Sequence, residues 1–201
     1  GGTLLLDEGG VVIPTLFEST DVPGFPAGPT GVDDEYRAVE AGRSPEREYW
    51  ARLARRRPDL DIGALWRDCS YVRGEVLGLI ARLAGRVRVV AFTNDMAHWF
   101  GDDWPERFPA VARFDAVLEA AKLGVLKPDP RAFRAAADAL GEESRRCLFV
   151  DDLAANLDGA RRAGMAAELF DVTDPAGSTA RVARALGLPA DEPARRRVWS
   201  P

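Results

Sequence analysis

Residues 3–10 read Thr-Leu-Leu-Leu-Asp-Glu-Gly-Gly, an aliphatic run followed by two acidic residues and two glycines, which predicts a buried strand that ends in a turn. Four more aliphatic runs follow, and helical patterns with a period of about 3.6 residues separate the later ones. The five runs are Leu4–Leu6, Val87–Phe92, Ala116–Leu118, Cys147–Val150 and Ala167–Phe170. This alternation predicts an α/β protein with a Rossmann-like, doubly wound parallel sheet. Ligands of such sheets bind beyond the carboxyl ends of the strands.

About eighty residues separate the first two predicted strands, which is too many for one crossover connection. A loop rich in proline and glycine comes first, and helical patterns follow it. Ser44-Pro45-Glu46 has the composition of a helix start, with the serine as N-cap. We therefore predict a small helical cap over residues 15–71, inserted into an α/β core that residues 1–14 and 72–201 form.

The composition narrows the classes of partner and the cellular location. The 201 residues have a formal net charge of −5, which is not typical of a protein that binds nucleic acid. No apolar run approaches the roughly 18–20 residues that a membrane span needs. The chain shows no signal peptide, and its two cysteines, Cys69 and Cys147, are far apart and expected as buried thiols. We expect a cytoplasmic protein, monomeric or homodimeric, with no nucleic-acid or membrane partner.

Polar side chains stand where the predicted strands end or the next helix begins. They are Asp7, Thr93, Asn94, Lys127, Asp151 and Asp152. Together they offer a nucleophile, donors for phosphoryl oxygens and ligands for a hard cation, as phosphoryl transfer through an aspartyl-phosphate requires. Each residue alone is a weak signal, because Asp and Thr often cap helices at such positions. Lys127 is more informative, because only two of the 27 basic residues are lysines.

The order and spacing of these residues resemble the four motifs of the haloacid dehalogenase-like (HAD) hydrolase superfamily, from Thr3 to about Thr173. The matching segments are Leu6–Val11, Phe92–Asn94, Gly124–Pro130 and Phe149–Ala160. The resemblance is closest to members with an acidic pair in the fourth motif, such as sugar-phosphate phosphatases and the phosphatase domain of soluble epoxide hydrolase. It implies a HAD-like core with a helical cap inserted between the first and second motifs.

The resemblance also implies how a metal would be held. Asp7 would attack phosphorus, and Mg²⁺ would be bound by the Asp7 carboxylate, the Gly9 carbonyl, Asp152 and water. Asp151 would support the metal's surroundings or fix the lysine. Asn156 would reach a metal-bound water, although a position on a helix surface is the commoner one for Asn.

The remaining implied roles concern the phosphoryl group. Thr93 and the backbone of Asn94 would bind its oxygens, and Lys127 would lie against Asp7 and the phosphoryl group as a point charge. The resemblance thus implies a Mg²⁺-dependent hydrolase of a small phosphorylated metabolite, with Asp7, Thr93 and Lys127 as catalytic residues.

One position departs from the family pattern. Its phosphatases usually carry a second Asp two residues after the nucleophile, which protonates the leaving group and later activates water. This chain has Gly9 there, and Glu8 should project to the opposite face of the strand from Asp7. We therefore expect slow or specialised turnover.

Two other functions stay open. One is a non-catalytic or residual-activity protein that binds a phosphorylated ligand. The other is a metal-free 2-haloacid dehalogenase, which also lacks the second Asp, although Asp151 and Asp152 would only repel each other in a metal-free site. A phosphonate-cleaving member of the family would need a cap lysine to form a Schiff base, and it is excluded because no lysine precedes Lys122. A phosphomutase would need the missing second Asp to move protons, so Gly9 disfavours that function.

His98 is expected in a surface or packing role. Tyr36, Trp50 and Trp66 are expected in the core of the cap, unless one faces the crevice.

Overall fold

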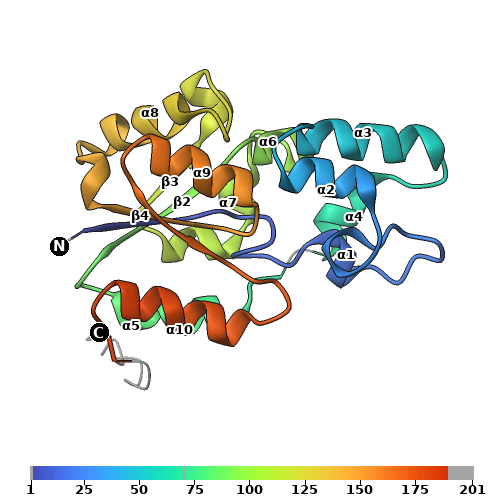
Figure 1. Cartoon of the computed structure of the whole chain (residues 1–201). Helices are drawn as coiled ribbons and strands as arrows, with labels where there is room; N and C mark the ends of the chain where they lie inside the picture. Colours follow the sequence, from blue (N-terminus) through green and yellow to red (C-terminus); the bar gives the residue numbers. More distant parts are fainter. Residues whose placement is uncertain (1, 70, 190–201) are drawn as a thin grey trace.

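The computed structural model describes residues 2–69 and 71–189, which form a five-stranded sheet with helices on both faces (Figure 1). The strands are β1 (Thr3–Leu6), β2 (Arg88–Thr93), β3 (Ala116–Glu119), β4 (Cys147–Asp151) and β5 (Ala166–Leu169). They are ordered β3-β2-β1-β4-β5, and every neighbouring pair is parallel. The predicted α/β fold with a doubly wound parallel sheet is therefore confirmed. Strands β2 and β4 run one residue farther than predicted, so Thr93 and Asp151 are the last residues of their strands.

Side chains of the central strands alternate between two hydrophobic clusters, one on each face of the sheet. Leu5, Phe92 and Phe149 belong to the cluster under α8 and α9. Leu4 and Leu6 belong to the cluster over α5 and α10, on the opposite face in Figure 1. The covering helices are α5 (Gly74–Leu83), α8 (Pro130–Leu140), α9 (Ala154–Arg162) and α10 (Pro175–Ala185). Strands buried on both faces explain the nearly continuous apolar runs in the sequence.

Of the α-helices between β1 and β2, the first four lie beyond the carboxyl ends of the strands (Figure 1). They are α1 (Leu16–Ser19), α2 (Asp34–Glu40), α3 (Glu46–Arg56) and α4 (Ile62–Cys69). Their aromatic side chains pack ring against ring, and Trp50 contacts both Phe17 and Trp66. Leu4 and Leu6 of the sheet belong to the same hydrophobic cluster as Trp50, so the core is continuous from the sheet into these helices.

The division into a cap of residues 15–71 and a core of residues 1–14 and 72–201 stays a prediction. Residues 1, 70 and 190–201 of that division lie outside the described part of the chain. The remaining helical elements are short. They are η1 (Gly28–Thr30), α6 (Met96–Phe100), α7 (Trp104–Arg107), η2 (Pro109–Arg113), η3 (Ala120–Leu123) and η4 (Ser144–Arg146).

Helix α3 begins one residue later than predicted, and Ser44 as its N-cap is wrong. Pro45 takes the N-cap position with extended backbone (φ −63°, ψ 141°) and without a side-chain cap hydrogen bond. The Ser44 hydroxyl instead accepts a hydrogen bond from Arg52 Nη2 at 3.0 Å. Glu46 is therefore the first residue of α3.

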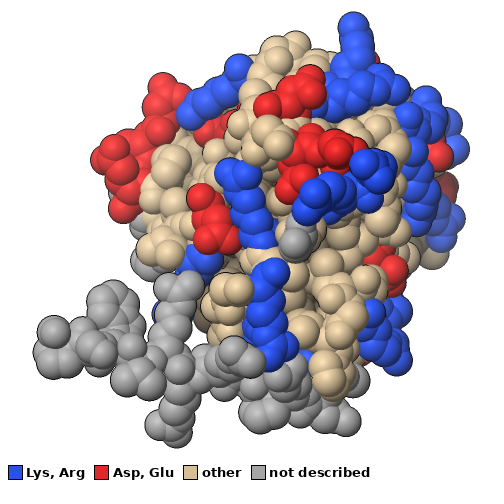
Figure 2. All heavy atoms as spheres, turned by 90° about the vertical axis from the view of Figure 1, so that its left-hand side faces the viewer, with Lys and Arg blue, Asp and Glu red and all other residues tan. Residues whose placement is uncertain are grey.

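The surface charges, the helix lengths and the cysteines can be compared with the predictions made from composition. On the face around the amino end of β1, Figure 2 shows Lys and Arg side chains interspersed with Asp and Glu. None of the described helices combines the length and apolar character that crossing a bilayer would take. Cys147 is buried with a free thiol, as predicted, whereas the side chain of Cys69 lies outside the described part of the structure.

Helix α9 approaches the start of α8 more closely than a side chain would allow. A Cβ atom on Gly159 would lie 2.1 Å from the Pro128 carbonyl oxygen and 2.8 Å from the Phe133 ring. We expect Gly159→Ala to lower the free energy of unfolding by about 1–3 kcal/mol, because packed backbone would have to shift. Urea unfolding measured by circular dichroism checks this value.

Gly78 provides the matched control, because it also lies inside a helix. A Cβ atom there would have nothing within 4 Å. Gly78→Ala should therefore stabilise the protein by about 0.5–1 kcal/mol through helix propensity alone. Two variants with equal unfolding midpoints would contradict the packing argument.

Candidate active site

The strand order brings the carboxyl ends of β1, β2 and β4 together. Leu6 pairs with Ala91 on one side and with Val150 on the other, so Asp7 follows β1 between the ends of its two neighbours. The Asp7 amide donates a hydrogen bond to the Val150 carbonyl at 3.0 Å and continues the pairing by one residue. This edge of the sheet is where the sequence predicted the site.

A cavity of about 560 Å³ opens at this edge of the sheet. Six of the candidate site residues line it, together with residues of α3 and α4. They are Asp7, Gly9, Thr93, Asn94, Lys127 and Asn156. Asp151 and Asp152 are not among the lining residues, but they and Asp7 offer carboxylate oxygen atoms within 4.8 Å of one another. The structure thus brings together all the side chains that the sequence placed in the site.

Lys127 is buried between the ends of three strands. Its Nζ atom lies 2.7 Å from Asp7 Oδ1, 3.3 Å from Asp151 Oδ2 and 2.9 Å from the Phe92 carbonyl oxygen. The rings of Phe92 and Phe149 lie 5.2 and 5.0 Å from the same atom. Burial alone would lower the pKa of Lys127, but the charges of Asp7 and Asp151 outweigh it and raise the pKa. The ammonium therefore stays charged in the site.

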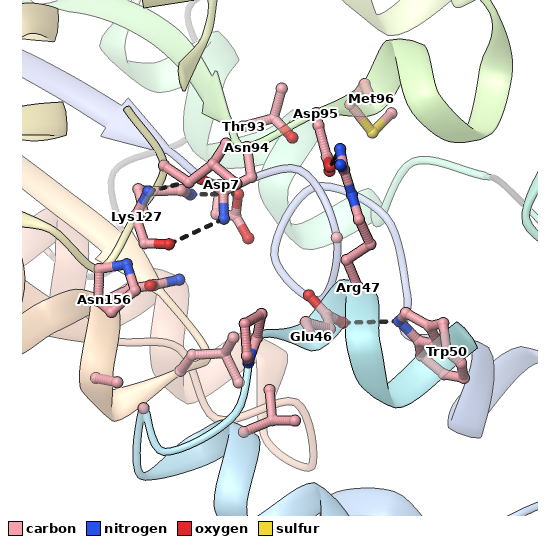
Figure 3. A pocket seen from close by; sticks show the side chains of 18 of the residues that line it. Asp7, Glu46, Arg47, Trp50, Thr93, Asn94, Asp95, Met96, Lys127 and Asn156 are labelled. Carbon is pink, nitrogen blue, oxygen red and sulfur yellow. Dashed lines mark hydrogen bonds and ion pairs between the residues drawn. The ribbon is translucent and has the colours of Figure 1, made fainter. Parts of the chain in front are cut away.

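The Asn94 side chain holds the backbone of Lys127 at both of its polar groups (Figure 3). The Lys127 amide donates to Asn94 Oδ1 at 2.8 Å, and Asn94 Nδ2 donates to the Lys127 carbonyl at 3.2 Å. The family resemblance implied only a backbone role for Asn94 toward phosphoryl oxygens, and that role stays a prediction. Its side-chain role was missed, because no sequence signal links two loops 33 residues apart.

Asp151 is fully buried, and both of its carboxylate oxygens accept hydrogen bonds. Oδ1 accepts from the Leu153 amide at 2.8 Å, and Oδ2 accepts from Asn156 Nδ2 at 2.9 Å and from Lys127. Asn156 is only 5% exposed, so the helix-surface position considered for it is wrong. Asn156 instead orients the carboxylate that contacts Lys127.

Asp152 differs from Asp151, because no ion pair to it is found in the described part of the chain. Burial and the charges of Asp151 and Asp7 raise the pKa of Asp152 well above its usual value. The backbone of Gly10 passes close by with a φ of +86°, and a Cβ atom there would lie 2.5 Å from the Asp152 carboxylate. Position 10 therefore requires glycine for two reasons, its left-handed backbone conformation and its close approach to the Asp152 carboxylate.

This set of oxygen donors fits a hard divalent cation. Three neighbouring carboxylates face one buried ammonium, so their mutual repulsion is only partly compensated. Burial raises the pKa of Asp7 to about 7 even though Lys127 pulls in the opposite direction. Carboxylate and carbonyl oxygens are the ligands that Mg²⁺ prefers. A bound cation would remove the imbalance.

Glu8 lies outside this group. It is fully buried, and both of its carboxylate oxygens are without a hydrogen-bond partner among the described residues. Burial and the charge of Asp7 raise the pKa of Glu8 to about 8. Glu8 is absent from the residues that line the cavity with Asp7, in keeping with the predicted opposite orientation.

Sequence reasoning missed Glu46, which reaches the cavity from the first turn of α3 (Figure 3). Trp50 Nε1 donates a hydrogen bond to Glu46 Oε1 at 3.2 Å. Burial, followed by the charge of Asp7, raises the pKa of Glu46 to about 7. In the sequence Glu46 signalled only a helix start, because the direction in which α3 presents it depends on how the helix packs.

The aromatic residues and the histidine fall into two groups. Tyr36, Trp50 and Trp66 are buried as predicted, and Trp50 and Trp66 also line the cavity. His98 is exposed and is not among the lining residues, which agrees with a surface role.

Known proteins resemble this chain in sequence and in fold. A family model described as haloacid dehalogenase-like hydrolase matches residues 24–164, more than two thirds of the chain. Phosphatase MT3486 of Mycobacterium tuberculosis (strain CDC 1551 / Oshkosh) is 53% identical over 57 residues, which are 28% of this chain and 26% of that protein. The chain therefore matches only about a quarter of the length of this curated relative.

Two solved structures show the same fold at low sequence identity. The HAD family enzyme bt-2542 of Bacteroides thetaiotaomicron, in complex with magnesium and inorganic phosphate, has a TM-score of 0.54 at 19% identity. The similarity covers 85% of this chain and 94% of that one. A dehalogenase with an intermediate complex has a TM-score of 0.58 at 18% identity, with 84% of each chain covered.

The carboxylate cluster predicts a response to metal. Millimolar Mg²⁺ should raise the thermal unfolding temperature, because a cation that binds only the folded chain stabilises it by about 2.7 kcal/mol at one hundred times its Kd. Asp152→Asn should reduce this shift, because it removes one of the oxygen charges. Differential scanning fluorimetry with Mg²⁺ or with EDTA measures both effects.

Asp158→Asn is the control for this experiment. Asp158 is exposed on α9 and pairs with Arg162 outside the carboxylate cluster, so this variant should keep the full Mg²⁺ shift. The metal site would be ruled out by the absence of any shift in the wild type, or by a shift that Asp152→Asn leaves unchanged.

Proposed function

The chain belongs to the haloacid dehalogenase-like hydrolases, and we propose that it hydrolyses small phosphomonoesters in a Mg²⁺-dependent reaction through an aspartyl-phosphate on Asp7. One observation carries this proposal. The Asp7 carboxylate lines the cavity, lies 2.7 Å from the buried Lys127 ammonium and adjoins two more carboxylates. A nucleophile, a fixed cation and a set of metal ligands therefore meet at one end of the sheet.

The residues around Asp7 suit phosphoryl transfer. Mg²⁺ would be held by the Asp7 carboxylate, the Gly9 carbonyl and Asp152, and when bound it would neutralise charge on the carboxylate and the phosphoryl group. Lys127 would bind a phosphoryl oxygen as a compact point charge, and the Thr93 hydroxyl and the Asn94 amide would donate to the others.

The reaction would proceed in two displacements. An Asp7 oxygen forms a bond to phosphorus while the bond from phosphorus to the leaving oxygen breaks, and the leaving oxygen takes a proton from water unless a side chain supplies one. Water then attacks the phosphorus of the aspartyl-phosphate, which releases inorganic phosphate and restores the Asp7 carboxylate. Asn94 and Asp151 would serve as positioning residues, because they hold Lys127 at its backbone and at its ammonium.

The cavity suits a small phosphorylated metabolite. Its volume of about 560 Å³ is in the usual range for small-molecule sites, and Trp50, Trp66 and Trp99 contribute apolar walls around the polar end. We propose a cytoplasmic location and a monomer or homodimer without nucleic-acid or membrane partners, in line with the acidic composition.

Gly9 determines which phosphates are good substrates if Asp7 and its neighbours act alone. In that case no carboxyl group would protonate the leaving oxygen, and aryl and acyl phosphates would react faster than alkyl phosphates. The backbone of Gly9 is not left-handed, and a Cβ atom there would meet only the Trp66 ring, at 3.7 Å. A side chain at this position is therefore sterically possible.

The carboxylate cluster favours this function over the two alternatives. A metal-free dehalogenase gains nothing from Asp151 and Asp152 beside its nucleophile, because the additional charges oppose ionisation of Asp7. A protein that only binds a phosphorylated ligand does not need the Asp7 carboxylate to face that ligand, because like charges repel.

Asp7→Asn tests the proposal. The variant keeps the shape of the side chain but removes the attacking charge, so turnover of p-nitrophenyl phosphate with Mg²⁺ should fall to background while the cooperative unfolding transition remains. The release of p-nitrophenolate and the unfolding curve of the same sample measure the two outcomes.

As a control, Glu143→Gln changes an exposed carboxylate that pairs with Arg145 away from the cavity lining, and it should keep wild-type turnover in this assay. Asp7→Asn with unchanged turnover would place the chemistry elsewhere. A wild type that releases halide from a 2-haloacid without metal would favour the dehalogenase, and a wild type that is inert on all of these compounds would favour the binding protein.

A further inference from the structure

One carboxyl group on the cavity wall has no part in the roles above. Glu46 comes from the start of α3, whereas Asp7 comes from the end of β1, and both line the same cavity. Figure 3 shows Glu46 across the cavity from Asp7, with one carboxylate oxygen turned to Trp50 and the other toward the open space. The two carboxyl groups therefore face the cavity from opposite sides.

The geometry of phosphoryl transfer gives this placement a meaning. The attacking and leaving oxygens lie roughly in line through phosphorus, so the leaving oxygen is on the side of phosphorus away from the nucleophile. With Asp7 as nucleophile at the end of the sheet, the leaving oxygen points toward α3. A group that protonates it must come from that side of the cavity.

We propose that Glu46 is the general acid and base of the phosphatase reaction, an inference that rests on the proposed function. In the first step the Glu46 carboxyl gives its proton to the leaving oxygen as the bond from phosphorus to that oxygen breaks, and the alcohol departs neutral. In the second step the Glu46 carboxylate takes a proton from water as the water oxygen bonds to phosphorus. The bond between phosphorus and the Asp7 oxygen breaks in the same step, which releases inorganic phosphate and restores the Asp7 carboxylate and the protonated Glu46.

Other charged side chains on the cavity wall are already paired. Asp95 pairs with Arg47, and Asp129 pairs with Arg131. Lys127 pairs with Asp7. For Glu46, no ion pair is found within residues 2–69 and 71–189. Its carboxyl group is therefore available to exchange a proton.

Aromatic packing fixes the position of Glu46. Trp50 donates its indole N–H to Glu46 Oε1 and is only 2% exposed. The Trp50 ring stacks on Phe17 with centroids 5.2 Å apart and meets Trp66 edge to face at 6.0 Å. One oxygen is thus held while the other is left for the substrate, and a pKa of about 7 suits a group that gives and takes a proton near neutrality.

The test compares leaving groups in Glu46→Gln. Glutamine keeps the oxygen that accepts from Trp50, so the fold should persist. We expect kcat/KM for glycerol 1-phosphate to fall about 10²–10⁴-fold, whereas kcat/KM for p-nitrophenyl phosphate falls less than tenfold because p-nitrophenolate leaves without a proton. A burst of p-nitrophenolate should precede steady turnover, because loss of the base slows hydrolysis of the aspartyl-phosphate. A structural defect would lower both kcat/KM values together.

Two further variants sharpen the test. Glu48→Gln changes the same residue type on the exposed side of α3, where Glu48 pairs with Arg52, and should alter neither kcat/KM value. Gly9→Asp combined with Glu46→Gln should restore kcat/KM for glycerol 1-phosphate at least tenfold, because it supplies another acid beside Asp7.

Leaving-group dependence in the wild type decides the case even if Glu46→Gln does not fold. With an acid in place, log kcat/KM should vary little with the pKa of the leaving alcohol across a series from aryl to alkyl phosphates, and a steep dependence would overturn the role of Glu46. Equal effects of Glu46→Gln on both substrate classes would overturn it as well. A wild type that turns over neither class with Mg²⁺ would overturn the proposed function itself, which distinguishes the two failures.

Discussion

The rest of the site depends on the contacts of the Lys127 ammonium. It joins the end of β1 through Asp7, the end of β4 through Asp151 and the end of β2 through the Phe92 carbonyl. An ammonium with 1% exposure can exist there only because these oxygens replace its water, and removing one partner of such a buried pair typically costs about 3–5 kcal/mol. The spacing of three strand ends is therefore tied to one charge.

The surroundings of that charge show why a metal belongs beside it. Asp151 uses both oxygens to hold Lys127, the Leu153 amide and Asn156, so it acts as a fixed acceptor. Asp7 has to satisfy Lys127 and still face the cavity, and Asp152 has no cation of its own among the described residues. One ammonium cannot balance the charge of three carboxylates, so the site lacks positive charge that a hard divalent cation would supply.

The sequence predicted the parts of this arrangement that follow from local pattern. Aliphatic runs located the strands, and parallel strands necessarily bring Asp7, Thr93 and Asp151 to one edge of the sheet. Roles that depend on how distant segments pack could not be found in this way. The Asn94 side chain meets a loop 33 residues later, and Glu46 faces the cavity only because Trp50 and its aromatic neighbours set the rotation of α3.

The inserted helices and the sheet contribute different halves of the site. The strand ends supply the charges that would act on the phosphoryl group, and these charges are fixed by pairing across the sheet. Helix α3 supplies Glu46 and Trp50, which line the cavity and would face the part of a substrate that departs, and Arg47 joins the same helix to Asp95 after β2. If Glu46 protonates the leaving oxygen, the side chains that recognise the alcohol stand next to the acid that releases it. A change in the packing of α3 would then alter substrate choice and proton transfer together, whereas the phosphoryl site would remain intact.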